Sequence, residues 1–123
     1  MAADTRLYFV NLENGVTVSS PVKIIFGLSG KGVAPAGVEK EGTGHHHILL
    51  NRPAFGDASG DDEIAKNGIP SDDNHIHFGG GQTEVRLELP PGTHSLQLLL
   101  GDHFHVPHDP VVASQRIMIT VTE

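Results

Sequence analysis

Apolar and polar residues alternate along several short segments of the chain with a period of two. Gln82–Leu89 has polar or charged residues at its even positions, and Val85, Leu87 and Leu89 at odd ones. Such alternation is typical of a β-strand that has one face in a core and the other in water. Arg116–Thr122 repeats the pattern, with Ile117, Ile119 and Val121 at its odd positions. Helical periodicity is nearly absent, so the pattern predicts strands.

The predicted strands are short and are separated by turn residues, which include many of the 15 glycines and eight prolines. They are Leu7–Asn11, Val16–Ser19, Val22–Gly27, His45–Asn51, His75–Phe78, Thr83–Leu89, Ser95–Leu100 and Arg116–Thr122. Seven or eight such strands indicate an all-β fold, an immunoglobulin-like antiparallel β-sandwich. A length of 123 residues fits one domain over 1–123, with residues 1–5 expected to be disordered.

A hairpin is predicted around Pro90-Pro91-Gly92, between the strands 83–89 and 95–100. Proline presets φ for a turn, and glycine can adopt φ > 0. In the returning strand, His94 is in phase with Leu96, Leu98 and Leu100. The alternation therefore predicts that His94 enters on the core face, near one end of the sandwich.

Two stretches lack strand patterning. Lys31–Gly44 is rich in glycine and alanine, and residues 52–74 form a long acidic loop. A loop of more than about 15 residues within a compact domain is usually functional or disordered. A solvated surface loop is the alternative reading of 52–74.

Composition narrows the possible functions. The chain has no cysteine, which excludes disulfides, thiolate zinc sites and blue copper centres. A formal net charge of −7 argues against binding to nucleic acid or to an anionic membrane surface. No apolar run approaches the roughly 20 residues of a membrane span, so membrane insertion is not expected.

The nine histidines gather in a few segments, and this clustering is the strongest chemical signal in the sequence. Residues i and i+2 of a strand share a face, so each H-x-H pair offers two imidazoles on one side. Neighbouring glycines allow sharp bends and close approach of the segments. The spacing predicts one metal site whose ligands are drawn from His45, His47, His75, His77, His105 and His108. A second group of candidates comprises His46, His94 and His103.

Each cluster taken alone has a simpler explanation. Exposed histidines, or histidines hydrogen bonded to the backbone, would show the same local sequence. The occurrence of several clusters in one short chain favours convergence. Imidazole suits copper and zinc, and Cu(II) stands at the top of the divalent affinity order, so copper is the expected ion and zinc the alternative. Asp102 and Asp109 could orient an imidazole, serve as ligands, or cap turns.

Five motifs, chained in order, carry a family resemblance. They are Thr43–Leu50 with its three histidines, Asn74–Gly79, Gly81–Glu84, Leu89–His94 and His105–His108. The chain resembles, from about Tyr8 to Val121, a family of small exported bacterial proteins catalogued as a domain of unknown function. The resemblance implies a signal peptide on the precursor, hence a periplasmic or secreted location. Met1-Ala2-Ala3 itself looks like a start placed before a mature sequence, with a genuine cytoplasmic start as the alternative.

Three functions are compatible with these observations. The first is a periplasmic metal-binding protein, with copper in sequestration, delivery or resistance. The second is a copper or zinc metalloenzyme, which needs an open coordination position and a nearby acid or base. The third is a non-metal envelope binding or structural module with structural or pH-sensing histidines. Binding is favoured over catalysis. The expected partner is a metal ion, with a homodimer or a metal-exchange protein left open.

Overall fold

The described residues include nine strands. The computed structural model describes residues 6–30, 32–33, 37, 43–55, 64, 68–69, 74–78, 83–102, 106–107 and 112–122. The strands are β1 (Arg6–Phe9), β2 (Thr17–Ser19), β3 (Val22–Ser29), β4 (Gly32–Val33), β5 (Thr43–Leu50), β6 (His75–Phe78), β7 (Glu84–Leu87), β8 (Gly92–Gly101) and β9 (Ile117–Thr122). In this part of the chain no helix is long and apolar enough to cross a membrane. The expectation about residues 1–5 lies outside the described residues.

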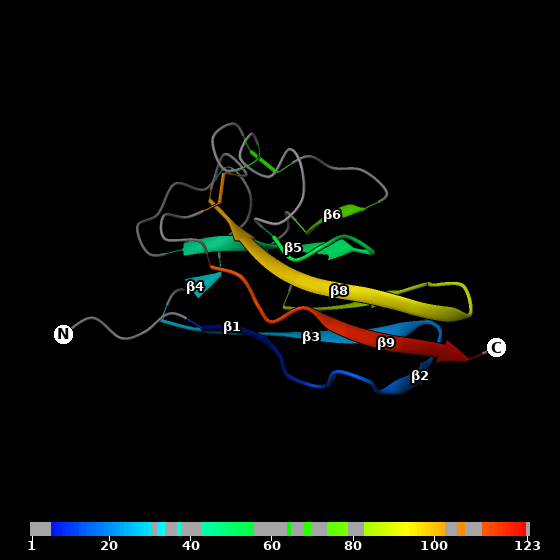
Figure 1. Cartoon of the computed structure of the whole chain (residues 1–123). Coiled ribbons are helices and arrows are strands. Elements are labelled where there is room, and N and C mark those ends of the chain that lie inside the picture. Colours follow the sequence, from blue (N-terminus) through cyan, green and yellow to red (C-terminus); the bar gives the residue numbers. More distant parts are fainter. Residues whose placement is uncertain are drawn as a thin grey trace.

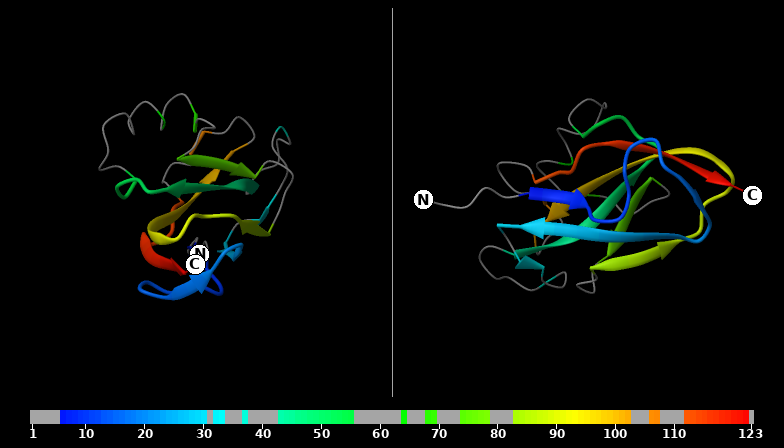
Figure 2. Two further views of the ribbon diagram at one scale, coloured as in Figure 1. Left: turned by 90° about the vertical axis from the view of Figure 1, so that its right-hand side faces the viewer. Right: turned by 90° about the horizontal axis from the view of Figure 1, so that it is seen from below.

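The strands form two packed sheets, which confirms the predicted β-sandwich (Figures 1 and 2). The smaller sheet has the order β1-β3-β7, and the larger has the order β2-β9-β8-β5-β4, with β6 also paired to β5. The first two strands divide between the sheets, since β1 pairs antiparallel with β3 while β2 pairs parallel with β9. The pairings β3–β7 and β9–β8–β5 correspond to the two sheets of an immunoglobulin-like sandwich.

The predicted hairpin between β7 and β8 is wrong. Strand β7 pairs with β3 in the small sheet, and β8 lies between β5 and β9 in the large one, so Pro90-Pro91 connects the two sheets. Strand β8 is buried at every position after Thr93, while β7 alternates between exposed and half-buried residues. A strand that is buried on both faces belongs in the middle of a sheet. The turn residues Pro90, Pro91 and Gly92 indicate a turn but do not specify whether the two strands it joins pair with each other.

The predicted irregular segment Lys31–Gly44 contains one short strand. Gly32–Val33 pairs in parallel with Thr43–Gly44 at the start of β5. Two residues are too few to show an alternating pattern, so no sequence signal for β4 exists. β4 and β6 lie in succession along the same edge of β5, because β6 pairs with His46–Leu49.

The main core lies between the two sheets. Apolar side chains of the large sheet, among them Ile48, Leu98 and Ile119, meet Ile24 and Phe26 of the small sheet, and all five are almost fully buried. Burial of apolar side chains of this size is the main stabilising term of such a domain. It fixes which face of β5 and β8 points inward, and therefore which histidines point outward.

A second apolar cluster covers the outer face of the large sheet. Leu49 and Leu99 pack there with Ile64 and Ile69, and Phe55 packs against them. Phe55, Ile64 and Ile69 all come from the connection between β5 and β6. The two ends of this connection are hydrogen bonded to each other: Leu50 N–H donates to Asn74 C=O (2.9 Å), and Asn74 Nδ2 donates to Leu50 C=O (2.9 Å). The outer face of β5 is thus covered by protein where an ordinary sandwich would meet water.

Candidate metal centre

Two histidines of β5 project from the outer face of the large sheet. In the antiparallel pairing of β5 with β8, His45 lies opposite Gly101 and His47 lies opposite Leu99. Directly opposed residues point to the same face, and Leu99 belongs to the outer apolar cluster. The pairing of β5 with β6 places His77 opposite His47 on that same face. Strand register alone therefore brings three imidazoles together.

The three rings converge closely enough to share one ion. His45, His47 and His77 each offer a ring nitrogen, and these nitrogens all lie within 4.8 Å of one another. The Nε2 atoms of His45 and His47 are 2.9 Å apart, and the His77 ring stacks on the His47 ring with centroids 5.1 Å apart. His45 and His47 are fully buried, whereas His77 is half-buried. His45 and His47 are therefore enclosed, and His77, whose Nε2 atom is itself buried, is the member of the cluster with the most exposed side chain.

Gly101 makes room for the His47 ring. A Cβ atom at this position would lie 2.9 Å from His47 Nε2 and 3.3 Å from Ile69 Cδ1. Contacts under 3.0 Å require something to move, so the ring, the backbone or Ile69 would have to shift. Only glycine allows the imidazole to lie across β8 beside His45.

Replacing Gly101 with alanine is accordingly expected to displace the His47 ring and to weaken metal binding by about tenfold, equivalent to ~1.4 kcal/mol. Calorimetric titration with Cu(II) measures the affinity, and circular dichroism checks that the sheet is retained. Unchanged affinity in a folded Gly101→Ala protein would show that the ring position is not needed for binding.

His46 points to the opposite face and lies outside the cluster. Its ring stacks on Phe26 in the main core, with centroids 4.3 Å apart, and neither ring nitrogen has a hydrogen-bond partner among the described residues. Burial, and to a smaller extent the charge of His45, lowers the pKa of His46 from 6.5 to about 4. The side chain is therefore neutral at pH 7 and separated from the other three by the sheet itself.

His94 is held by hydrogen bonds at both ring nitrogens. Nε2 lies 2.8 Å from Pro90 C=O, which can only accept, so Nε2 carries the proton. Nδ1 then accepts from Asn51 Nδ2 at 3.1 Å. Asn51 has a positive φ of 56°, and its Oδ1 accepts the N–H of Ser95. His94 thus ties the end of β5 to the start of β8, and both nitrogens are committed to this structural role.

The remaining residues predicted from the sequence are not part of the cluster, or they lie outside the described residues. His75 is buried on the same outer face, opposite Leu49, but it is not part of the three-residue cluster. Asp102 Oδ1 accepts the N–H of Val106 at 3.0 Å, the turn-capping role considered for it. His103, His105, His108 and Asp109 lie outside the described residues.

The apolar surroundings of the cluster were not predicted as part of a site. Leu99 and Ile69 are buried beside the histidines, on the face that alternation alone assigns to water. The all-apolar run Leu98–Leu100 was the available signal, because a strand exposed on one face would not carry leucine at three successive positions.

Comparison with known proteins supplies a family but no activity. No curated protein and no solved structure matches the chain. A family model described as a domain of unknown function (DUF4399) matches residues 24–122, which include the three converging histidines and Gly101. Since this match covers most of the 123 residues, the chain belongs to the DUF4399 family.

Proposed function

We propose that this protein binds a transition-metal ion through His45, His47 and His77, and that the ion is copper. The observation that carries the proposal is the convergence of three ring nitrogens within 4.8 Å of one another, two of them fully buried. Imidazoles gathered beside apolar side chains lose their water, and a bound cation would replace that lost interaction. Neutral imidazole is also the commonest metal ligand in proteins.

The donor set favours copper over zinc. All three donors are imidazole nitrogens, which suit both ions, and Cu(II) forms the more stable complexes. His45 Nε2 and His47 Nε2 lie 2.9 Å apart, within hydrogen-bond distance of each other, and a bound ion would replace that contact.

The proposed role is sequestration or delivery in the periplasm. Three protein ligands leave at least one coordination position, and the half-buried His77 marks the side from which an ion or an exchange partner would approach. His105 and His108 remain proposed additional ligands. Gly101 lies opposite His45 in the strand pair. His105 is four residues further along the chain, and four residues span at most about 14 Å, so the His105 Cα lies within that distance of the Gly101 Cα.

Calorimetric titration of the untagged protein with Cu(II) and Zn(II) tests the proposal. One ion per chain with a submicromolar Kd for Cu(II) is expected, together with spin resonance that shows three or more nitrogen ligands. Since imidazole must be deprotonated to bind, the affinity should fall below about pH 6. Weak, nonsaturating binding, or affinity that stays constant from pH 5 to 8, would contradict a dedicated imidazole site.

A further inference from the structure

Strand β1 leaves one side of its backbone without a strand partner. It is an edge strand of the small sheet and pairs only with β3. Val10 N–H donates to Ile25 C=O at 2.9 Å, and hydrogen-bonded pairs alternate along an antiparallel ladder. The N–H and C=O groups of Leu7 and Phe9 therefore point away from β3. No backbone hydrogen bond to another described residue uses these groups.

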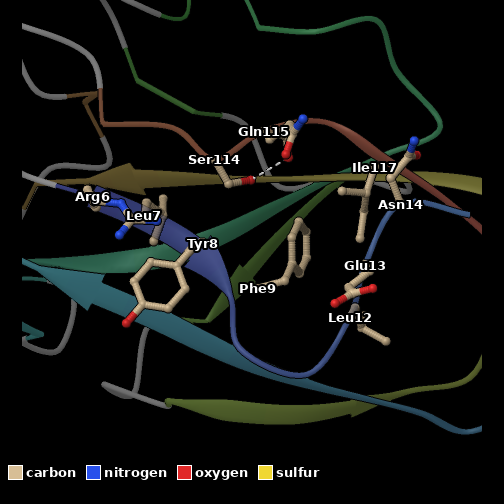
Figure 3. Close-up of a pocket in the computed structure, with 10 residues that line it drawn as sticks. All are labelled: Arg6, Leu7, Tyr8, Phe9, Leu12, Glu13, Asn14, Ser114, Gln115 and Ile117. Atoms are coloured by element: carbon tan, nitrogen blue, oxygen red, sulfur yellow. Dashed lines mark hydrogen bonds between the residues drawn. The ribbon is translucent and has the colours of Figure 1, made fainter. Parts of the chain in front are cut away.

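A pocket of about 320 Å³ runs along this edge (Figure 3). Segment 114–117, which leads into β9, lines it together with β1. Leu7, Leu12 and Ile117 provide buried apolar surface, and Phe9 lies between the two ends of the pocket. The pocket thus offers an unpaired backbone edge above an apolar floor.

Opposite charges stand at the two ends of the pocket. Arg6 lies at one end, with its guanidinium 5.1 Å from the Tyr8 ring centroid, and Glu13 lies at the other (Figure 3). The Ser114 hydroxyl already bonds within the protein, and so does the side-chain Oδ1 of Asn14, which accepts the N–H of Met118. Arg6 and Glu13 form no ion pair in the described part of the chain, so both charges are available to a ligand.

We propose that this edge binds an extended peptide segment of a partner protein, antiparallel to β1. Added strands gain main-chain hydrogen bonds from an open edge and specificity from pockets for alternate side chains. β1 runs from the Arg6 end towards Glu13, so an antiparallel peptide places its first residues at Glu13 and its last at Arg6. The favoured segment has a basic residue first, apolar residues over Phe9, and an acidic residue last. This inference is independent of the metal centre.

Nuclear magnetic resonance of the ¹⁵N-labelled full chain, titrated with the end-blocked peptide Lys-Val-Thr-Val-Glu, tests the proposal. The amide signals of Leu7 and Phe9 should shift, and their hydrogen exchange should slow on binding. Arg6→Glu should weaken binding of this peptide by about fivefold and strengthen binding of Lys-Val-Thr-Val-Lys, because a surface attraction becomes a repulsion. Arg86→Glu, the same charge change on exposed β7, should leave both affinities unchanged.

Three results would overturn the proposal. The first is no change of the Leu7 and Phe9 signals at millimolar peptide. The second is equal binding of a peptide whose central amides are methylated, since main-chain bonding would then be absent. The third is protection of both amides before any peptide is added, which would show that the edge is already occupied. In that last case, the protection is measured again after dilution. Protection that is lost on dilution would identify a second copy of the chain as the occupant, and protection that persists would identify the chain's own terminal residues.

Discussion

His77→Ala is expected to weaken Cu(II) binding by at least about 100-fold, or ~2.7 kcal/mol, while His75→Ala changes it by less than about threefold. The two residues lie two positions apart on β6 and share a face, so His75→Ala is a control on the same strand. Only His77 belongs to the cluster with His45 and His47. Because His77 is half-buried, its loss should leave the sheet intact.

Calorimetric titration of both variants, alongside the unaltered protein, gives the comparison. Equal losses would mean that both residues of β6 contact the ion, and equal retention would remove β6 from the site. A large loss in His75→Ala alone would place the ion further along the strand, opposite Leu49 rather than opposite His47.

His46→Phe is expected to raise the free energy of unfolding at pH 7 by about 1–3 kcal/mol. The imidazole buries two polar atoms that have no hydrogen-bond partner among the described residues, and such atoms cost free energy when they leave water. Phenylalanine keeps the stacked contact with Phe26 and removes both polar atoms. Urea unfolding of the metal-free protein measures the difference.

The same substitution should reduce the loss of stability in acid. The pKa of His46 in the folded state is about 4, below its ordinary value of 6.5, so the unfolded chain takes up the proton first. Above pH 6.5, protonation of His46 therefore does not affect the free energy of unfolding. As the pH decreases from 6.5 to about 4, this group lowers the free energy of unfolding by roughly 3 kcal/mol in all. The gap between His46→Phe and the unaltered protein should therefore widen across that interval. If the difference in unfolding free energy between the two proteins stayed constant over this interval, His46 would take up its proton equally readily in the folded and unfolded states.

Local patterning in the sequence was sufficient to predict the strands and the pairing of histidines within them. Short runs of strand-forming residues between turn residues identified eight of the nine strands, and the two-residue period of a strand correctly placed His45 with His47 on one face. That inference needs only the geometry of a single strand. The third converging residue, His77, was also among the candidates, although its position opposite His47 depends on a register that alternation does not specify.

The features that depended on contacts distant in sequence could not be predicted. The partner of β7 is β3 rather than β8, because β8 is buried on both faces and occupies the middle of the large sheet. The structural role of His94 depends on Asn51, 43 residues earlier in the chain. His46 and His47 have the same residue type and adjacent positions, and only the packing of the two sheets separates a core residue from a proposed ligand.

Imidazole ¹⁵N magnetic resonance of the histidine-labelled protein, recorded before and after one equivalent of Zn(II), tests the central claim most directly. Zn(II) is diamagnetic and accepts the same imidazole ligands, so each coordinated nitrogen can be observed individually. The ring nitrogens of His45, His47 and His77 should shift together, while those of His46 and His94 stay unchanged. Saturable binding that leaves these three residues unaffected, or that shifts His94 instead, would contradict the assignment of the metal centre.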